Sequence, residues 1–177
     1  MGTAQPELTL AECLAVAVAA IACGFDLRTR RIPNALTFGA AGAGLVFHAV
    51  IQGPSGAVSS LGGCLLGAGL FFPLFALGGM GAGDVKLVGA LGAWLGPGQA
   101  VWVVLSSAIA GGVLGLVYAL AIGYARTAIT NVLALLAYWR TVGLRPAPEL
   151  TLANQRVPRF PYALPIAVGT IFTVWFR

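Results

Sequence analysis

Two aspartates carry the chemistry that this sequence is expected to perform. Asp26 begins the stretch DLRTRRIPN and Asp84 lies in GGMGAGDVKL, and the chain contains no other aspartate. When two carboxyl groups share a proton, one remains ionised and can activate water, while the other donates a hydrogen bond to a carbonyl oxygen. Such a pair can hydrolyse an amide without a metal and without a Ser or Cys nucleophile. We therefore interpret Asp26 and Asp84 as a candidate catalytic dyad.

Other residue types that support hydrolysis are scarce. His48 is the only histidine and lies within a long apolar run, which supports neither a Ser-His-Asp triad nor a His-rich metal site. We interpret it as a hydrogen-bonding residue in helix packing. Cys13, Cys23 and Cys64 are isolated in apolar segments and form no C-x-x-C pair, so we expect packing roles for them. No metal and no cofactor is predicted.

Each aspartate also has a purely structural interpretation. Asp26 could pair with one of the arginines at positions 28, 30 and 31, and Asp84 could cap the helix that begins beside it. The other acids are weaker candidates for chemistry. We expect Glu7 and Glu12 to face water or headgroups at the outer end of the first apolar run, and Glu149 to form a surface ion pair.

The composition indicates an integral membrane protein. Only 8% of the 177 residues are charged, against roughly a quarter in ordinary globular domains, and 59% are hydrophobic. Such a chain cannot cover a water-soluble surface, and its length allows about six helical spans. The first basic residue is Arg28, so the N-terminal apolar run lacks the positive region of a secretory signal and is predicted to be a retained span.

Six apolar runs can be placed along the chain. They cover residues 8–25, 35–52, 57–78, 85–95, 99–124 and 161–176. If the N-terminus is outside, nine of the ten Lys and Arg residues fall in cytoplasmic segments, as the positive-inside rule requires, and both aspartates lie on the cytoplasmic side. We therefore predict one all-α transmembrane domain over residues 1–177, a bundle of about six helices in the lipid bilayer.

Three further expectations concern the connecting segments. Because the fourth run is short, either its helix begins within GMGAGD or the membrane is locally thin there. The apolar stretch 127–139 is predicted to be an interfacial or cytoplasmic continuation of the fifth helix. The basic residues lie between apolar runs rather than along one face, so no nucleic-acid partner is indicated.

Glycine is abundant within and between the runs. The stretches GAAGAG at 39–44 and GGCLLGAG at 62–69 should let helix backbones approach closely. The glycines at 78, 79, 81 and 83 precede Asp84, and we expect a non-helical segment there that lines a cavity and accommodates an extended peptide. A nucleotide-binding loop is not indicated, because GMGAGD lacks the G-x-G-x-x-G spacing and no βαβ unit surrounds it.

With these residues the sequence resembles a known family. GMGAGDVKLVGALGAWLG resembles the G-x-G-D signature of type IV prepilin peptidases, and DLRTRRIPN resembles the segment that carries their first catalytic aspartate. PYALPIAVG is similar to the family's last helix. The three pieces make up about a fifth of the chain, and their order and helix context match across nearly all of it. The G-x-G-D motif alone is shared with presenilin-like intramembrane proteases.

The resemblance implies an aspartic endopeptidase of the bacterial inner membrane that removes the basic leader of prepilins or pseudopilins at the cytoplasmic face. Asp26 and Asp84 match the two catalytic aspartates. Gly81 and Gly83 match the signature glycines and are expected to bind substrate. Lys86 stands just after the signature, where it either anchors its helix at the headgroups or contacts an acidic substrate residue.

One departure from the larger family members has a consequence. Those proteins carry a cytoplasmic domain with paired C-x-x-C motifs and methylate the new N-terminus. This chain lacks that domain and those cysteines. It therefore resembles the short, peptidase-only form found in tight-adherence (Flp) pilus systems, and no methyltransferase domain is expected.

Two other functions remain open. A small transporter or channel subunit could use buried aspartates to bind a cation or a proton. A presenilin-like protease would cut within the transmembrane helix of its substrate instead of at the membrane edge. The sequence predicts neither the oligomeric state nor the distance between the two aspartates in the absence of substrate.

Overall fold

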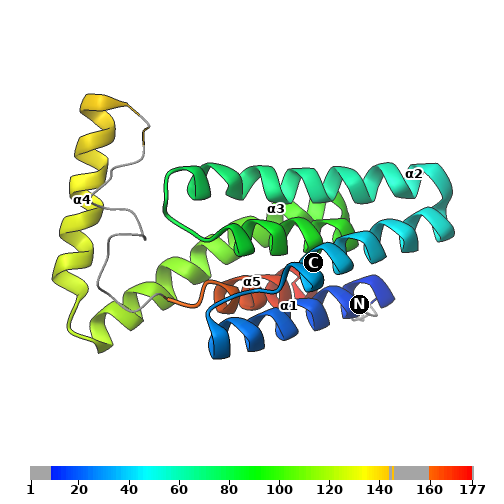
Figure 1. Ribbon diagram of the computed structural model, residues 1–177, viewed down its shortest axis with the longest axis horizontal. Helices are drawn as coiled ribbons and strands as arrows, with labels where there is room; N and C mark the ends of the chain where they lie inside the picture. Colours follow the sequence, from blue (N-terminus) through cyan, green and yellow to red (C-terminus); the bar gives the residue numbers. More distant parts are fainter. Residues whose placement is uncertain (1–8, 144, 146–159, 177) are drawn as a thin grey trace, which may run out of the picture.

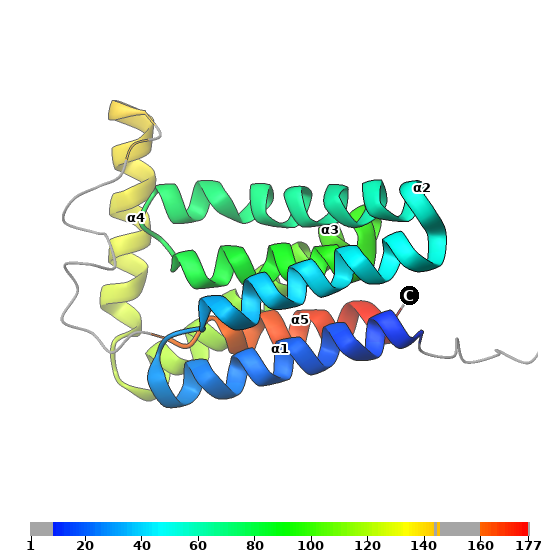
Figure 2. The same cartoon turned by 45° about the vertical axis from the view of Figure 1, so that its right-hand side comes forward.

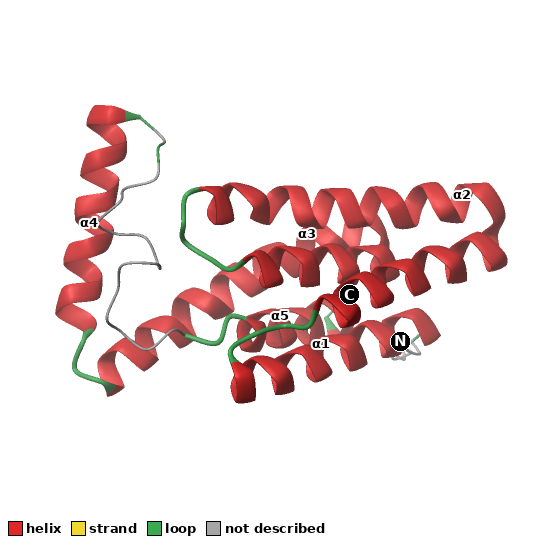
Figure 3. Ribbon diagram, viewed as in Figure 1, coloured by secondary structure: helices red, strands yellow, loops and turns green. Residues whose placement is uncertain are grey.

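The computed structural model describes residues 9–143, 145 and 160–176. These residues form helices and loops without any strand, which confirms the all-α fold class (Figure 3). The helices are α1 (Leu10–Thr29), α2 (Asn34–Ala76), α3 (Ala82–Ala121), α4 (Ala125–Val142) and α5 (Ala163–Trp175). Glu7 and Glu149 lie outside the described residues.

The two longest helices each turn back on themselves at a Gly-Pro pair. Gly53 (φ 67°, ψ −152°) interrupts α2, and Gly96 (φ 77°, ψ 174°) interrupts α3. Glycine adopts a positive φ at little cost, and the proline that follows each one lacks the N–H that would continue the helix. Each helix therefore folds into two arms, as Figures 1 and 2 show.

The predicted apolar runs correspond to these arms and to α1 and α5. The helices α1, α2 and α3 are long and apolar enough to cross a membrane, and α5 is a shorter apolar helix. This chain is therefore an all-α membrane protein, while the count of six spans stays a prediction. The start of α3 at Ala82 confirms that the fourth run begins its helix within GMGAGD.

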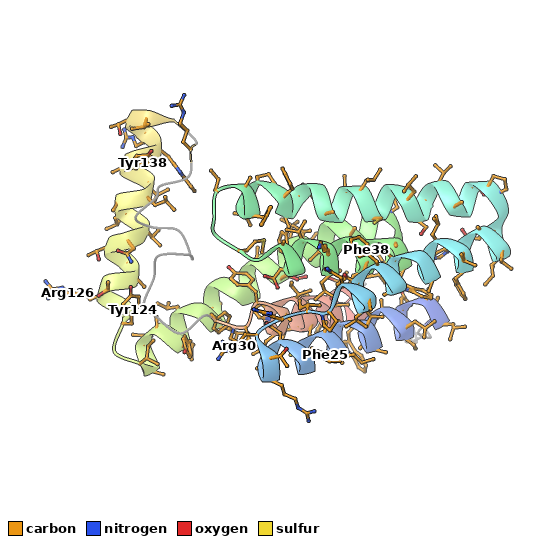
Figure 4. The ribbon with its side chains drawn as sticks, in the orientation of Figure 1. Phe25, Arg30, Phe38, Tyr124, Arg126 and Tyr138 are labelled. Atoms are coloured by element: carbon orange, nitrogen blue, oxygen red, sulfur yellow. The ribbon has the colours of Figure 1, made fainter. Side chains whose placement is uncertain are left out.

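The helix α4 differs from its prediction. It does not continue the preceding helix, because Gly123 (φ 71°) ends α3 and a separate helix begins at Ala125. No residue of α4 is buried. Figure 4 shows α4 apart from the bundle that carries Phe25 and Phe38, with Arg126 pointing away from that bundle. Its expected position at the membrane interface stays a prediction.

The first arm of α3 is the centre of the bundle, packed among α1, α2 and α5. Close backbone approach explains how α2 fits against it: a Cβ at Gly63 would collide with the carbonyl oxygen of Gly92. Gly44 and Gly67 also pack against the α3 backbone. The predicted role of the glycine stretches is thus confirmed at positions 44, 63 and 67, whereas positions 39, 42, 62 and 69 have open space around them.

Side chains of α2 satisfy carbonyl groups at the break in α3. The carbonyl of Ala93 would ordinarily accept from the N–H of residue 97, but that residue is Pro97. The hydroxyl of Ser60 donates to Ala93 O instead (2.7 Å), and His48 Nε2 lies 2.9 Å from the carbonyl oxygen of Trp94. The predicted packing role of His48 is confirmed.

Candidate active site

Asp26 reaches the interior because it continues the buried face of α1. The buried residues Ala15, Ala19 and Ala22 recur at helical spacing, and Asp26 lies one turn further on. Small side chains let α1 pack closely against α5 and α3. The Asp26 side chain is 8% exposed, and its Oδ2 accepts a hydrogen bond from the backbone N–H of Ala163 (3.2 Å). The first residue of α5 thus holds one oxygen of this carboxylate.

Asp84 lies in the first turn of α3. It is also 8% exposed, and its Oδ2 accepts from the backbone N–H of Gly81 (3.1 Å), the residue that precedes the helix. The structural interpretation of Asp84 is therefore correct in part, since it does bind a free amide at the start of its own helix.

Both aspartates line one cavity of about 290 Å³. The carboxylates interact electrostatically across it. The rest of the lining comes from the segment after α1, from the start of α2 and from the start of α3 with the residue before it: Arg30, Arg31, Ile32, Asn34, Gly81, Ala82, Gly83 and Lys86. Residues distant in sequence thus form a single site, in which a backbone N–H holds one oxygen of each aspartate.

Other cavities among the described residues differ in character. Grooves of about 450 and 360 Å³ run along α3 and α5, and their lining residues include no acid. No group of three or more His, Cys, Asp and Glu side chains able to hold a metal ion occurs in the described part of the chain. The smaller cavity around the aspartates is therefore the candidate for hydrolytic chemistry.

The alternative ion-pair interpretation of Asp26 is not supported by the described part of the chain. Within the described residues, Asp26 makes no ion pair with the arginines at 28, 30 and 31, and its bond goes to α5. Glu12 also differs from expectation, because it is 3% exposed rather than facing water or headgroups. Its Oε2 accepts from the backbone N–H of Thr9 (2.8 Å), and its Oε1 accepts from Gln99 Nε2 (3.2 Å).

The glycines before Asp84 are more regular than predicted. Of the four, only Gly78 has a positive φ (78°). Gly81 is extended with φ −82°, and Gly83 already belongs to α3. Their lack of a side chain matters for space: a Cβ at Gly81 would lie 3.1 Å from Asp84 Oδ2, and one at Gly83 would lie 3.4 Å from Ile32 Cβ. The predicted non-helical segment therefore ends at Gly81.

Lys86 has partners that sequence reasoning missed. Its Nζ donates to Asn34 Oδ1 (2.9 Å) and lies 5.2 Å from the centre of the Phe38 ring, a cation–π contact. Phe38 on α2 and Arg30 after α1 are labelled in Figure 4. Asn34 is the last residue of DLRTRRIPN. The sequence could not predict its contact with Lys86, because an asparagine at the start of a helix is most often a capping residue.

A comparison with known families decides what this arrangement belongs to. The model of the type IV leader peptidase family matches residues 13–116, which is more than half of the chain and includes both aspartates. This chain belongs to the type IV leader peptidase family. The matched residues end within α3, so α4 and α5 lie beyond them.

Individual members of the family agree with this assignment. A prepilin leader peptidase/N-methyltransferase of Legionella pneumophila is 38% identical over 99 residues, which cover 52% of this chain and 34% of that protein. One of Burkholderia pseudomallei is 37% identical over 103 residues, covering 52% of this chain and 32% of that protein. The alignment thus spans about a third of the length of these relatives. No solved structure matches the chain.

Proposed function

We propose that this protein is an aspartic endopeptidase that removes the basic leader peptide of type IV prepilins or pseudopilins. The observation that carries the proposal is the cavity shared by Asp26 and Asp84 in a member of the leader peptidase family. Two relatives that carry the name prepilin leader peptidase/N-methyltransferase support the substrate class. We propose the cytoplasmic face of the bacterial inner membrane as the place of cleavage.

In the proposed reaction the two aspartates act as a pair. One carboxylate takes a proton from a water molecule, which attacks the scissile carbonyl carbon. The other carboxyl group, protonated, donates to the carbonyl oxygen as it gains negative charge. The first carboxyl group then passes the proton taken from water to the amide nitrogen, the C–N bond breaks, and the leader leaves with a new carboxyl terminus while the mature chain keeps the amine. The free oxygens of Asp26 and Asp84 serve these steps, because a backbone N–H holds the remaining oxygen of each.

The rest of the cavity is proposed to position the substrate. Gly81 and Gly83 leave room for an extended peptide backbone beside Asp84. Lys86, which donates a hydrogen bond to Asn34, is proposed to reach an acidic substrate side chain from the cavity wall.

Mapping the cut distinguishes this function from its rivals. The protein and a prepilin are co-expressed in membranes, and the mature N-terminus is determined by mass spectrometry. We expect a single cut between the basic leader and the apolar segment. A cut inside the apolar segment would support a presenilin-like protease, and ion flux in proteoliposomes without cleavage would support a transporter subunit.

A further inference from the structure

The first residue of α5 donates a hydrogen bond to Asp26, although α5 lies outside the residues that match the family. Among the described residues, no other segment outside the match bonds to either aspartate. Asp26 lies in the last turns of α1, where the carbonyl ends of the helix disfavour a negative charge. The N-terminus of another helix has the opposite polarity and exposes free N–H groups. Because α5 begins beside Asp26, its N-terminus stabilises the negative charge of this carboxylate. This counteracts the unfavourable electrostatic effect of the C-terminal end of α1.

The N–H groups of the first turn of α5 can all be accounted for. Leu164 N–H donates to Pro161 O and Ile166 N–H donates to Tyr162 O, both at 3.3 Å. Residue 165 is a proline and has no N–H. The remaining N–H, that of Ala163, donates to Asp26 Oδ2. Since Tyr162 supplies no side-chain cap, Asp26 serves as the cap of α5.

The position of this turn is fixed from the other side by α3. The rings of Tyr118 and Phe160 lie 5.5 Å apart, and those of Phe160 and Tyr162 lie 6.1 Å apart. The Tyr162 ring packs over Gly111, where a Cβ would come within 3.4 Å of the ring. The turn at 160–163 is thus held between α3 and Asp26.

We propose that the N-terminal turn of α5 is a positioning element of the active site, which orients Asp26 through the Ala163 N–H and leaves Oδ1 free for the water molecule. Ala163 is a positioning residue, since it acts through Asp26 and touches no reacting atom. This inference rests on the proposed peptidase function and extends the site beyond the matched residues. It predicts that α5 determines the rate of the chemical step and not the binding of the substrate.

A backbone ester at residue 163 tests the bond directly. Replacing Ala163 by its α-hydroxy acid deletes one N–H and changes no side chain, and the same replacement at Ile166 deletes an N–H that donates to Tyr162 O. Both proteins are assayed in bilayer nanodiscs with a purified prepilin, and their unfolding is measured. We expect kcat to fall about tenfold for the ester at 163 with KM unchanged, since the loss of one such bond is worth about 1.4 kcal/mol. The ester at 166 should keep kcat within about twofold.

A second pair of variants tests the support from α3 by ordinary mutagenesis. Gly111→Leu would push Tyr162 away, whereas Gly112→Leu adds the same side chain where nothing lies within 4 Å of a Cβ. We expect kcat to fall for the first variant alone. Equal kcat for the two esters together with equal kcat for the two leucine variants would overturn the inference. Cleavage by Asp26→Asn in the same assay would reject the proposed function itself, so the two failures are distinguishable.

Discussion

Lys86 on α3 donates a hydrogen bond from Nζ to the side-chain Oδ1 of Asn34 on α2, at 2.9 Å. The bond joins the first turn of α3 to the first turn of α2 at the edge of the cavity that holds both aspartates. It gives the only lysine of the chain a defined place at the site. Lys86 is thus tied to the scaffold before any substrate arrives.

This bond predicts different effects for its two partners. Lys86→Met removes the charge and keeps most of the apolar stem, while Asn34→Ala removes only the acceptor. We expect KM for a prepilin to rise about tenfold for Lys86→Met, because a charged hydrogen bond to the substrate is worth about 1.5–3 kcal/mol. Asn34→Ala should change KM by no more than about twofold. Equal KM values for both variants would show that Lys86 only ties the helices together.

The contact between Gly63 and Gly92 predicts a strong effect on stability. Gly63→Ala places a Cβ against the Gly92 carbonyl oxygen and must separate α2 from α3. We expect it to lower the free energy of unfolding in mixed micelles by about 1–3 kcal/mol. Gly62→Ala is the matched control, because a Cβ there meets nothing within 4 Å. A similar stability for both variants would argue against the close packing of these two arms.

Ser60 predicts a smaller and more local effect. Ser60→Ala leaves the Ala93 carbonyl without its donor, since Pro97 cannot replace it. We expect a loss of about 1 kcal/mol in the free energy of unfolding. Ser55→Ala removes a hydroxyl that bonds to Gln52 O at an exposed position and should cost less. A larger loss at Ser55 than at Ser60 would contradict the proposed repair of the α3 break.

Local signals in the sequence predicted the helices and singled out the two aspartates as candidates for chemistry. Apolar runs interrupted by Gly-Pro pairs indicate helical arms, and an acid in such surroundings is conspicuous because burial of a charge is costly. The local hydrogen bonding of Glu12 could also be predicted from the sequence, since Thr9 and Glu12 have the spacing of a capping box. This local signal competes with the general expectation that an acid at the end of a span faces water.

Long-range contacts could not be predicted in the same way. Asn34 and Lys86 are 52 positions apart, and Asp26 and Ala163 are 137 positions apart. The donor at position 163 is a backbone N–H, which every residue except proline carries, so no residue type marks it. The regular helix at Gly83 was missed for a related reason: glycine permits unusual backbone angles but does not require them.

The most direct test of the account compares single substitutions of the two aspartates in membranes that contain a prepilin. Asp26→Asn and Asp84→Asn keep the size of each side chain and remove its ability to exchange a proton, and Glu12→Gln is the control for a buried acid outside the cavity. We predict that leader removal, followed by gel mobility and intact mass, is abolished in both aspartate variants and retained in the control. Full cleavage by both Asp26→Asn and Asp84→Asn would contradict the assignment of this cavity as a peptidase site.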